Sequence, residues 1–286
     1  MPGKTLTWTL ALAAAAWAQV GAPDASWGAD RLAAAMRGKD AAVAVEAAKA
    51  LGELKDDAAA FDALASAVTD AKLDATVRSA ALRALEKRGD ARATTCLVAT
   101  LGDERLGSAA AEALARYPSP ELTKQLGQIA AGDKKAKRRA DAVYALGRLH
   151  DASAFQPLLA TMRDKDAEVR ARACLAVAAY NDQKAVEPLL VNLNTDKDWR
   201  GRLAAAQALG LVRDERSVKP LCERLEDDRA EVRGAAACSL AAIGDVRAMD
   251  PLRAGVAKEK NDAARAAMTA ALEKIKADIL KGVKIK

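Results

Sequence analysis

One histidine and four cysteines are the residues of this chain that most often carry metal or nucleophile chemistry. A zinc site, or a nucleophile with its base, needs several such groups close together. His150 stands alone at an expected turn, and Cys96, Cys174, Cys222 and Cys238 are far apart in sequence. Phosphate-binding glycine loops are also absent. The sequence therefore predicts no catalytic residue, no metal site and no cofactor.

A more regular polar pattern pairs aspartate with arginine. In four successive places an aspartate stands six residues before an arginine. A catalytic constellation would occur once, whereas this one recurs at a nearly constant interval. We interpret it as a structural ladder in which charge-assisted hydrogen bonds tie turns to neighbouring helices. Its members are Asp133, Arg139, Asp164, Arg170, Asp196, Arg202, Asp227 and Arg233.

The ladder follows a repeat that occupies nearly the whole chain. The residues that open the second segment of each repeat lie 29 to 34 positions apart. Seven positions later every copy has Ala or Ser, and eight positions later every copy has Leu or Val. Such self-similarity is typical of stacked repeats. The opening residues are Val43, Val77, Leu106, Arg138, Val169, Gly201, Val232 and Ala264.

Each repeat has the pattern of two helices. Val218, Leu221, Cys222 and Leu225 lie at i, i+3, i+4 and i+7 of one first segment, which is amphipathic helical spacing. Strand-like alternation is absent from the sequence. A hairpin of this size cannot bury its own apolar face, so it must stack on its neighbours. The sequence predicts an all-α fold, an α-α superhelix (solenoid) of about eight helical hairpins.

Local signals predict where the helices begin and end. Aspartates in the turns suit N-caps of second helices, and glycines suit C-termini. The expected N-caps are Asp74, Asp166 and Asp198, and the expected C-terminal glycines are Gly89 and Gly244.

The segments Pro220–Asp227 and Val232–Asp245 resemble HEAT-like repeats of the short type known from phycobilisome lyase subunits. The resemblance covers roughly residues 24–277. It departs in the third unit, where Gly107 replaces the usual arginine and Tyr117-Pro118-Ser119 replaces the final Gly-Asp. The resemblance implies that the second helices line the concave side of the solenoid.

The N-terminus has the pattern of a secretory signal peptide. Lys4 precedes the apolar stretch Thr5–Trp17, and Ala16-Trp17-Ala18 is a small-x-small cleavage signal. The stretch is shorter than the ~20 apolar residues of a membrane span. An uncleaved anchor or an extra helix is the alternative. We expect cleavage after Ala18 and an exported protein, either periplasmic or extracellular.

The predicted organisation is a signal peptide at 1–18 followed by one solenoid at 19–286. The solenoid has eight units and a basic tail. Their approximate bounds are 24–56, 57–90, 91–119, 120–151, 152–182, 183–214, 215–245 and 246–277, with the tail at 278–286.

The repeat register also places the cysteines. Cys174 and Cys222 fall at core positions, Cys96 lies beside one, and Cys238 falls on the open face. Only Cys222 and Cys238 share a hairpin, and they point in opposite directions. Because a disulfide needs Cα atoms within about 7 Å of each other, we expect four free thiols.

Positions three, six and ten of each second segment vary most in residue type and are expected to face away from the core. In units one to four these positions are mainly charged, and in units five to seven they are mainly apolar. The first group is Glu46, Lys49, Glu53, Arg83, Lys87, Glu112, Arg116, Asp141, Tyr144 and Arg148. The second group is Leu175, Ala179, Gln207, Leu211, Cys238 and Ala242.

An exposed apolar stripe over three units is typical of a partner-binding surface. Trp199, two residues before a second-segment opening, is expected to flank it. The alternative is tight curvature that buries these side chains against neighbouring units. The candidate partner-binding residues are Tyr144, Leu175, Trp199, Gln207, Leu211 and Cys238.

The leading hypothesis is an exported, non-catalytic scaffold that binds a protein or peptide partner on its concave surface. One alternative is binding of a polyanion or nucleic acid through the basic cluster Lys134–Arg139. An exported location makes nucleic acid an unfavourable partner. Another alternative is an accessory subunit of a lyase-type enzyme.

Overall fold

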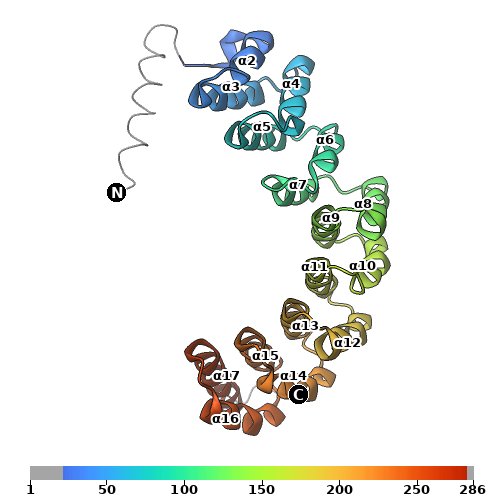
Figure 1. The fold of residues 1–286 in the computed structure, drawn as a ribbon, viewed down its shortest axis with the longest axis vertical. Coiled ribbons are helices and arrows are strands. Elements are labelled where there is room, and N and C mark those ends of the chain that lie inside the picture. Colours follow the sequence, from blue (N-terminus) through green and yellow to red (C-terminus); the bar gives the residue numbers. More distant parts are fainter. Residues whose placement is uncertain (1–21, 282–286) are drawn as a thin grey trace. The chain divides into compact units, whose positions relative to one another are not determined.

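The computed structural model describes residues 22–281, whose regular secondary structure is helical, with no strand among them. The α-helices alternate as first and second members of eight hairpins (Figure 1). The first helices are α2 (Ala29–Met36), α4 (Ala58–Thr69), α6 (Ala93–Thr100), α8 (Pro120–Gly132), α10 (Phe155–Thr161), α12 (Val186–Thr195), α14 (Val218–Glu223) and α16 (Met249–Lys258). The second helices are α3 (Ala41–Glu53), α5 (Ala75–Arg88), α7 (Gly107–Leu114), α9 (Ala136–Leu149), α11 (Ala167–Ala178), α13 (Trp199–Val212), α15 (Ala230–Ile243) and α17 (Asp262–Leu280). The predicted all-α solenoid of helical hairpins is confirmed.

Short 3-10 helices precede most of the first helices and one follows α14. They are η1 (Ala25–Trp27), η2 (Ala152–Ala154), η3 (Gln183–Ala185), η4 (Glu215–Ser217), η5 (Arg224–Glu226) and η6 (Val246–Ala248).

The chain forms two compact units, and the division falls between Tyr117 and Pro118. The first unit contains α2 to α7 and the second contains α8 to α17. The division lies within the Tyr117-Pro118-Ser119 stretch, where the sequence departs from the repeat pattern. Ser119 caps α8 there and Pro120 is its first residue, a position in which proline's missing N–H costs nothing.

In the second unit the second helices α9, α11, α13, α15 and α17 pack side by side in one row. The first helices form the other row (Figure 1). Within this unit the second helices lie on the inner side of the curve (Figure 1). The core lies between the two rows, and the leucine or valine eight positions after each opening residue is buried in every hairpin. These residues are Leu51, Leu85, Leu114, Leu146, Val177, Leu209, Leu240 and Leu272.

The second helices approach one another very closely. A Cβ added to Gly147 of α9 would lie 2.8 Å from the Cβ of Ala176 in α11. The same geometry recurs at Gly210, where a Cβ would lie 2.8 Å from the Cβ of Ser239. Ala176 and Ser239 occupy the position that is Ala or Ser in every repeat. Small residues at this position are therefore required by the contact between consecutive second helices.

The predicted helix ends are confirmed. The side chains of Asp74, Asp166 and Asp198 accept hydrogen bonds from backbone amides at the start of α5, α11 and α13. Gly89 and Gly244 end α5 and α15 with φ values of 69° and 78°. This left-handed conformation carries little steric cost for glycine.

The four cysteines are free thiols, as the sequence predicts. Cys96 and Cys174 are buried and Cys238 is exposed. Cys222 is only half-buried, in contrast to the predicted core position. The reason is local, because α14 ends at Glu223 and the chain turns into η5, so that Cys222 lies in the last turn of a short helix.

The predicted signal peptide at 1–18 lies outside the described residues. Among residues 22–281, no helix combines the length and apolar character that a membrane crossing requires.

The close approach of α9 and α11 can be tested with Gly147→Ala. Alanine favours an isolated helix by about 0.5–1 kcal/mol over glycine. Here the added Cβ would also lie 3.1 Å from the Cα of Ala176. We expect the free energy of unfolding of the second unit to fall by about 1–3 kcal/mol, measured by urea denaturation with circular dichroism.

Gly132→Ala is the matched control. Gly132 ends α8, and a Cβ at this residue meets nothing within 4 Å. This variant should be as stable as the wild type or slightly more stable. Gly147→Ala with unchanged or higher stability would contradict the close contact.

Candidate functional site

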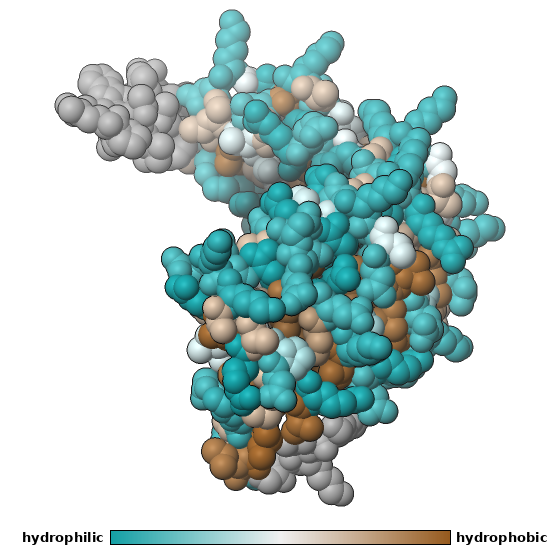
Figure 2. All heavy atoms as spheres, turned by 60° about the horizontal axis from the view of Figure 1, so that its bottom comes forward, coloured by the Kyte–Doolittle hydropathy of each residue, from teal (hydrophilic) through white to brown (hydrophobic). Residues whose placement is uncertain are grey.

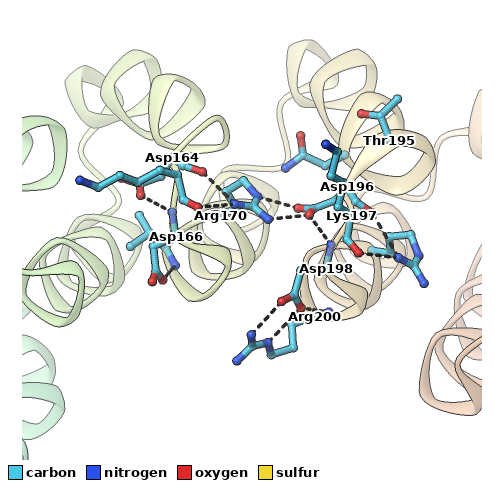
Figure 3. Close-up of polar contacts among 12 residues, drawn as sticks. Asp164, Asp166, Arg170, Thr195, Asp196, Lys197, Asp198 and Arg200 are labelled. Carbon is cyan, nitrogen blue, oxygen red and sulfur yellow. Dashed lines mark hydrogen bonds and ion pairs between the residues drawn. The ribbon is translucent and has the colours of Figure 1, made fainter.

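The ladder arginines join consecutive hairpins. The Nη1 of Arg170 donates to the backbone oxygen of Asp164 at 2.9 Å, within the same unit of the repeat. Its Nε and Nη2 donate to the two carboxylate oxygens of Asp196 in the next hairpin, at 2.7 and 2.6 Å (Figure 3). One side chain thus holds the turn of its own hairpin and the turn of the following one.

The other ladder arginines repeat this geometry. Each donates from Nη1 to the backbone oxygen six residues earlier, and from Nε and Nη2 to a carboxylate 25 or 26 residues later. Arg139 donates to the backbone oxygen of Asp133 at 2.8 Å and to the carboxylate of Asp164 at 2.7 and 2.7 Å. Arg202 donates to the backbone oxygen of Asp196 at 3.2 Å and to the carboxylate of Asp227 at 2.8 and 2.9 Å. Arg233 donates to the backbone oxygen of Asp227 at 2.8 Å and to the carboxylate of Glu259 at 2.5 and 2.7 Å.

The aspartate six residues before each arginine therefore contributes its backbone carbonyl, and the side-chain pair forms with the next hairpin. The last carboxylate is Glu259, which the Asp-Arg pattern did not identify. In the first unit Arg78 likewise bonds a backbone carbonyl and a carboxylate of the next hairpin. Its Nη2 donates to the backbone oxygen of Val68 at 2.9 Å and to the carboxylate of Asp103 at 2.6 Å.

Strong pairing keeps the carboxyls of Asp227 and Glu259 ionised. Burial opposes ionisation of Asp227, but the hydrogen bonds from Arg202 and from the amide of Arg229 outweigh it and lower its pKa to about 2. The hydrogen bonds from Arg233 likewise lower the pKa of Glu259 to about 2. A general acid or base needs a pKa near the working pH, so these carboxyls suit a structural role.

A groove lies on the row of second helices in the second unit. It has a volume of about 890 Å³ and is formed by α11, α13, α15 and α17. The lining is mostly apolar or small, and Gln207, Arg213, Glu231 and Asn261 are among its polar members. The apolar and small lining residues are Leu175, Leu203, Gly210, Leu211, Ala230, Gly234, Ala235, Cys238, Ala242, Ala263, Ala264 and Ala267.

Two of the largest apolar side chains in this groove are exposed to solvent. Leu175 is 40% exposed and Leu211 is 60% exposed. Only six large hydrophobic residues are exposed among residues 22–281, and two of them lie here. The face of the molecule in Figure 2 is largely hydrophilic, and hydrophobic patches interrupt it. Of the two alternatives for this stripe, exposure is therefore the one observed, and burial by tight curvature is not.

The structure brings together four of the six candidate partner-binding residues, because Leu175, Gln207, Leu211 and Cys238 all line the groove. Trp199 is half-buried at the start of α13, with the Arg229 guanidinium 4.8 Å from its ring, and does not line the groove.

Tyr144 also lies outside the groove. It belongs to α9, which contributes no residue to the groove, and its ring is 5.9 Å from the guanidinium of Arg172. Sequence reasoning missed the contribution of α17, whose Ala263 and Ala267 belong to the last repeat. The run of small residues in that helix is the signal that could have identified it.

One residue assigned to the charged open face is buried instead. Asp141 has no exposed surface and pairs with Lys137 at 2.8 Å and with Arg172 of α11 at 3.2 Å. The reason is tertiary, because Arg172 reaches back from the neighbouring helix and covers this carboxylate.

Ion pairs with carboxylates of the second compact unit neutralise much of the basic cluster Lys134–Arg139. Lys137 pairs with Asp141, Arg138 with Asp133 at 3.1 Å, and Arg139 with Asp164. Within this cluster, Lys134 and Lys135 are the exposed cations that form no ion pair with any of residues 22–281. Two lysines are a small electrostatic footprint for a polyanion.

His150 ends α9 in a left-handed conformation with a φ of 52°. Its ring centroid is 5.8 Å from that of Tyr180. In the part of the chain that the structure describes, no three His, Cys, Asp or Glu side chains are grouped so as to hold a metal ion.

The repeats of this chain match a known family. The family model of HEAT repeats matches residues 28–115, 71–147, 123–210 and 186–273, so that the matches together extend from residue 28 to residue 273. A search of curated proteins finds no significant match.

Several solved structures are similar to this chain. YibA of E. coli has a TM-score of 0.56 at 19% identity, covering 88% of this chain and 93% of YibA. The karyopherin Kap121p, bound to the extreme C-terminus of the protein phosphatase Cdc14p, has a TM-score of 0.68 at 13% identity, covering 90% of this chain and 35% of Kap121p. The CpcE–CpcF complex of phycocyanin lyase from a Nostoc species has a TM-score of 0.41 at 19% identity, covering 87% and 94%.

The ladder can be tested with Arg170→Met, which keeps most of the side-chain volume. Asp196, whose side chain is only 2% exposed, would lose its charged partner. We expect a loss of stability on the order of 3 kcal/mol, the range for breaking a buried ion pair. Urea denaturation followed by circular dichroism measures it.

Arg200→Met serves as the control. Arg200 pairs with Asp198 at 2.8 Å but is half exposed, so its loss should lower the stability much less than the loss of Arg170 does. Equal effects of the two substitutions would show that the ladder contributes no more than a surface ion pair.

Proposed function

The chain belongs to the HEAT repeat family, and we propose that it is a non-catalytic scaffold that binds a protein or peptide partner in the groove of its second unit. The exposed apolar side chains of Leu175 and Leu211 in that groove are the observation that carries the proposal. Monomeric soluble proteins rarely leave such side chains together in solvent unless they take part in an interaction.

The groove offers the mixture of contacts that partner sites use. Its apolar floor comes from small residues of α15, such as Gly234 and Cys238, with Leu175 on α11 and Leu211 on α13. Gln207 and Arg213 add hydrogen-bond donors among the lining residues. An apolar centre with few polar groups matches the anatomy of protein interfaces.

Two further observations support a binding role. The charged residues that recur most regularly are engaged in the ladder, so that they hold the hairpins together. Kap121p, a solenoid of related fold, is bound to the extreme C-terminus of Cdc14p. By analogy of fold, a peptide segment is a suitable occupant for the groove here.

We further propose that the protein is exported, on the basis of the signal-peptide pattern at residues 1–18. A partner would then be a protein or peptide of the periplasm or the extracellular space.

The double substitution Leu175→Asp and Leu211→Asp tests the groove. It places two charges on the apolar floor, so partner capture should be lost, while circular dichroism should show unchanged helix content because both side chains are exposed. Immobilised wild-type and variant proteins would be exposed to the same extract, and the retained proteins identified by mass spectrometry.

Val191→Asp is the matched control, because Val191 is 53% exposed on α12, in the row of first helices. It should retain the wild-type set of proteins. If the double variant retains that set as well, the groove is not the binding site.

Export is tested by sequencing the N-terminus of the protein purified from its own cells. Cleavage after Ala18 predicts a mature chain that begins at Gln19. Recovery of the protein with Met1 still attached, in the cytoplasmic fraction, would exclude export.

A further inference from the structure

A second concavity lies in the first unit, between the second helices α3 and α5. Its volume is about 700 Å³. The walls are apolar where Val45, Ala75, Ala80 and Ala84 line them. It is separate from the groove of the second unit, since every residue that lines it lies between positions 45 and 105.

Four cations and one carboxylate line this cavity. The carboxylate is Glu53, and it pairs with Lys87 at 2.5 Å. Lys49 pairs with Glu46 at 2.7 Å. The guanidinium groups of Arg83 and Arg105 remain, and neither forms an ion pair with any of residues 22–281.

The carboxylates nearest to the two arginines do not form ion pairs with them. Both side chains are exposed. Asp74 lies close enough to Arg105 to feel its charge, but its carboxylate is occupied by the amide and hydroxyl of Thr76. Glu86 similarly lies near Arg83 and also near Arg116, with no hydrogen bond to either side chain.

We propose that this cavity binds carboxylate side chains of an acidic peptide segment. Two unpaired guanidinium groups offer planar, bidentate donors that match carboxylates. The hydroxyl of Ser79 adds a hydrogen-bond partner, and the small apolar walls accommodate the aliphatic parts of glutamate side chains.

The lining favours a peptide over a single-stranded nucleic acid. Binding of single strands uses aromatic side chains on which the bases stack. No aromatic residue lines this cavity. The site acts independently of the apolar groove, because all its groups belong to the first unit.

The test uses the full chain and a dye-labelled peptide of alternating glutamate and alanine, with fluorescence anisotropy as the readout. The wild type binds this peptide, and raising the salt concentration weakens binding because the contact is ionic. The variant Arg83→Glu with Arg105→Glu should bind at least about tenfold more weakly, which corresponds to about 1.4 kcal/mol. Arg83→Gln with Arg105→Gln should lose affinity to a smaller extent.

Two controls separate the site from general charge and from the groove. Arg163→Glu with Arg253→Glu makes the same change in net charge at exposed positions of the second unit and should bind within twofold of the wild type. The Leu175→Asp, Leu211→Asp variant should also bind normally, so that this proposal and the proposed function stand or fall separately.

Three results would overturn the proposal. The first is unchanged affinity in the Arg83, Arg105 double reversal. The second is equal binding of a peptide in which glutamine replaces glutamate. The third is tighter binding of a single-stranded oligonucleotide that is lost in the same double reversal, which would assign the cavity to nucleic acid.

Discussion

Consecutive second helices pack so closely that, at several contacts, glycine faces alanine or serine. Gly147 against Ala176 and Gly210 against Ser239 show the contact in the second unit, and Gly52 against Ala84 shows it in the first. Because no hairpin can bury its apolar face alone, this packing, together with the contacts between first and second helices, encloses the core. The recurring Ala or Ser position of the repeat follows from it.

The ladder joins the turns of consecutive hairpins in the second unit. Packing of small side chains is not directional, whereas an arginine that bonds a carbonyl and a carboxylate at once sets the spacing of two turns. Four such arginines, from Arg139 to Arg233, follow one another in the second unit, and their last carboxylate is Glu259. Gly107 occupies the corresponding position in the third hairpin, and Asp133 is held by Arg138 within its own unit.

With the small residues and the arginines committed to structure, the remaining exposed positions of the second helices can vary. In the second unit they are apolar around Leu211, and in the first they are cationic around Arg83. Both surfaces arise on the same scaffold without a change of fold. The function of such a chain therefore depends on the exposed positions of its repeats.

The sequence by itself determined the repeat, the eight hairpins, the helix ends and the arginines of the ladder, because these depend on spacing and capping within one segment. Only the tertiary structure decided which aspartate meets which arginine, because each pair joins groups of separate hairpins. It also placed Asp141 under Arg172, brought α17 into the groove and left Trp199 and Tyr144 outside it. Periodicity indicates the face of a helix on which a side chain lies, but the distance and angle between neighbouring helices decide what that side chain contacts.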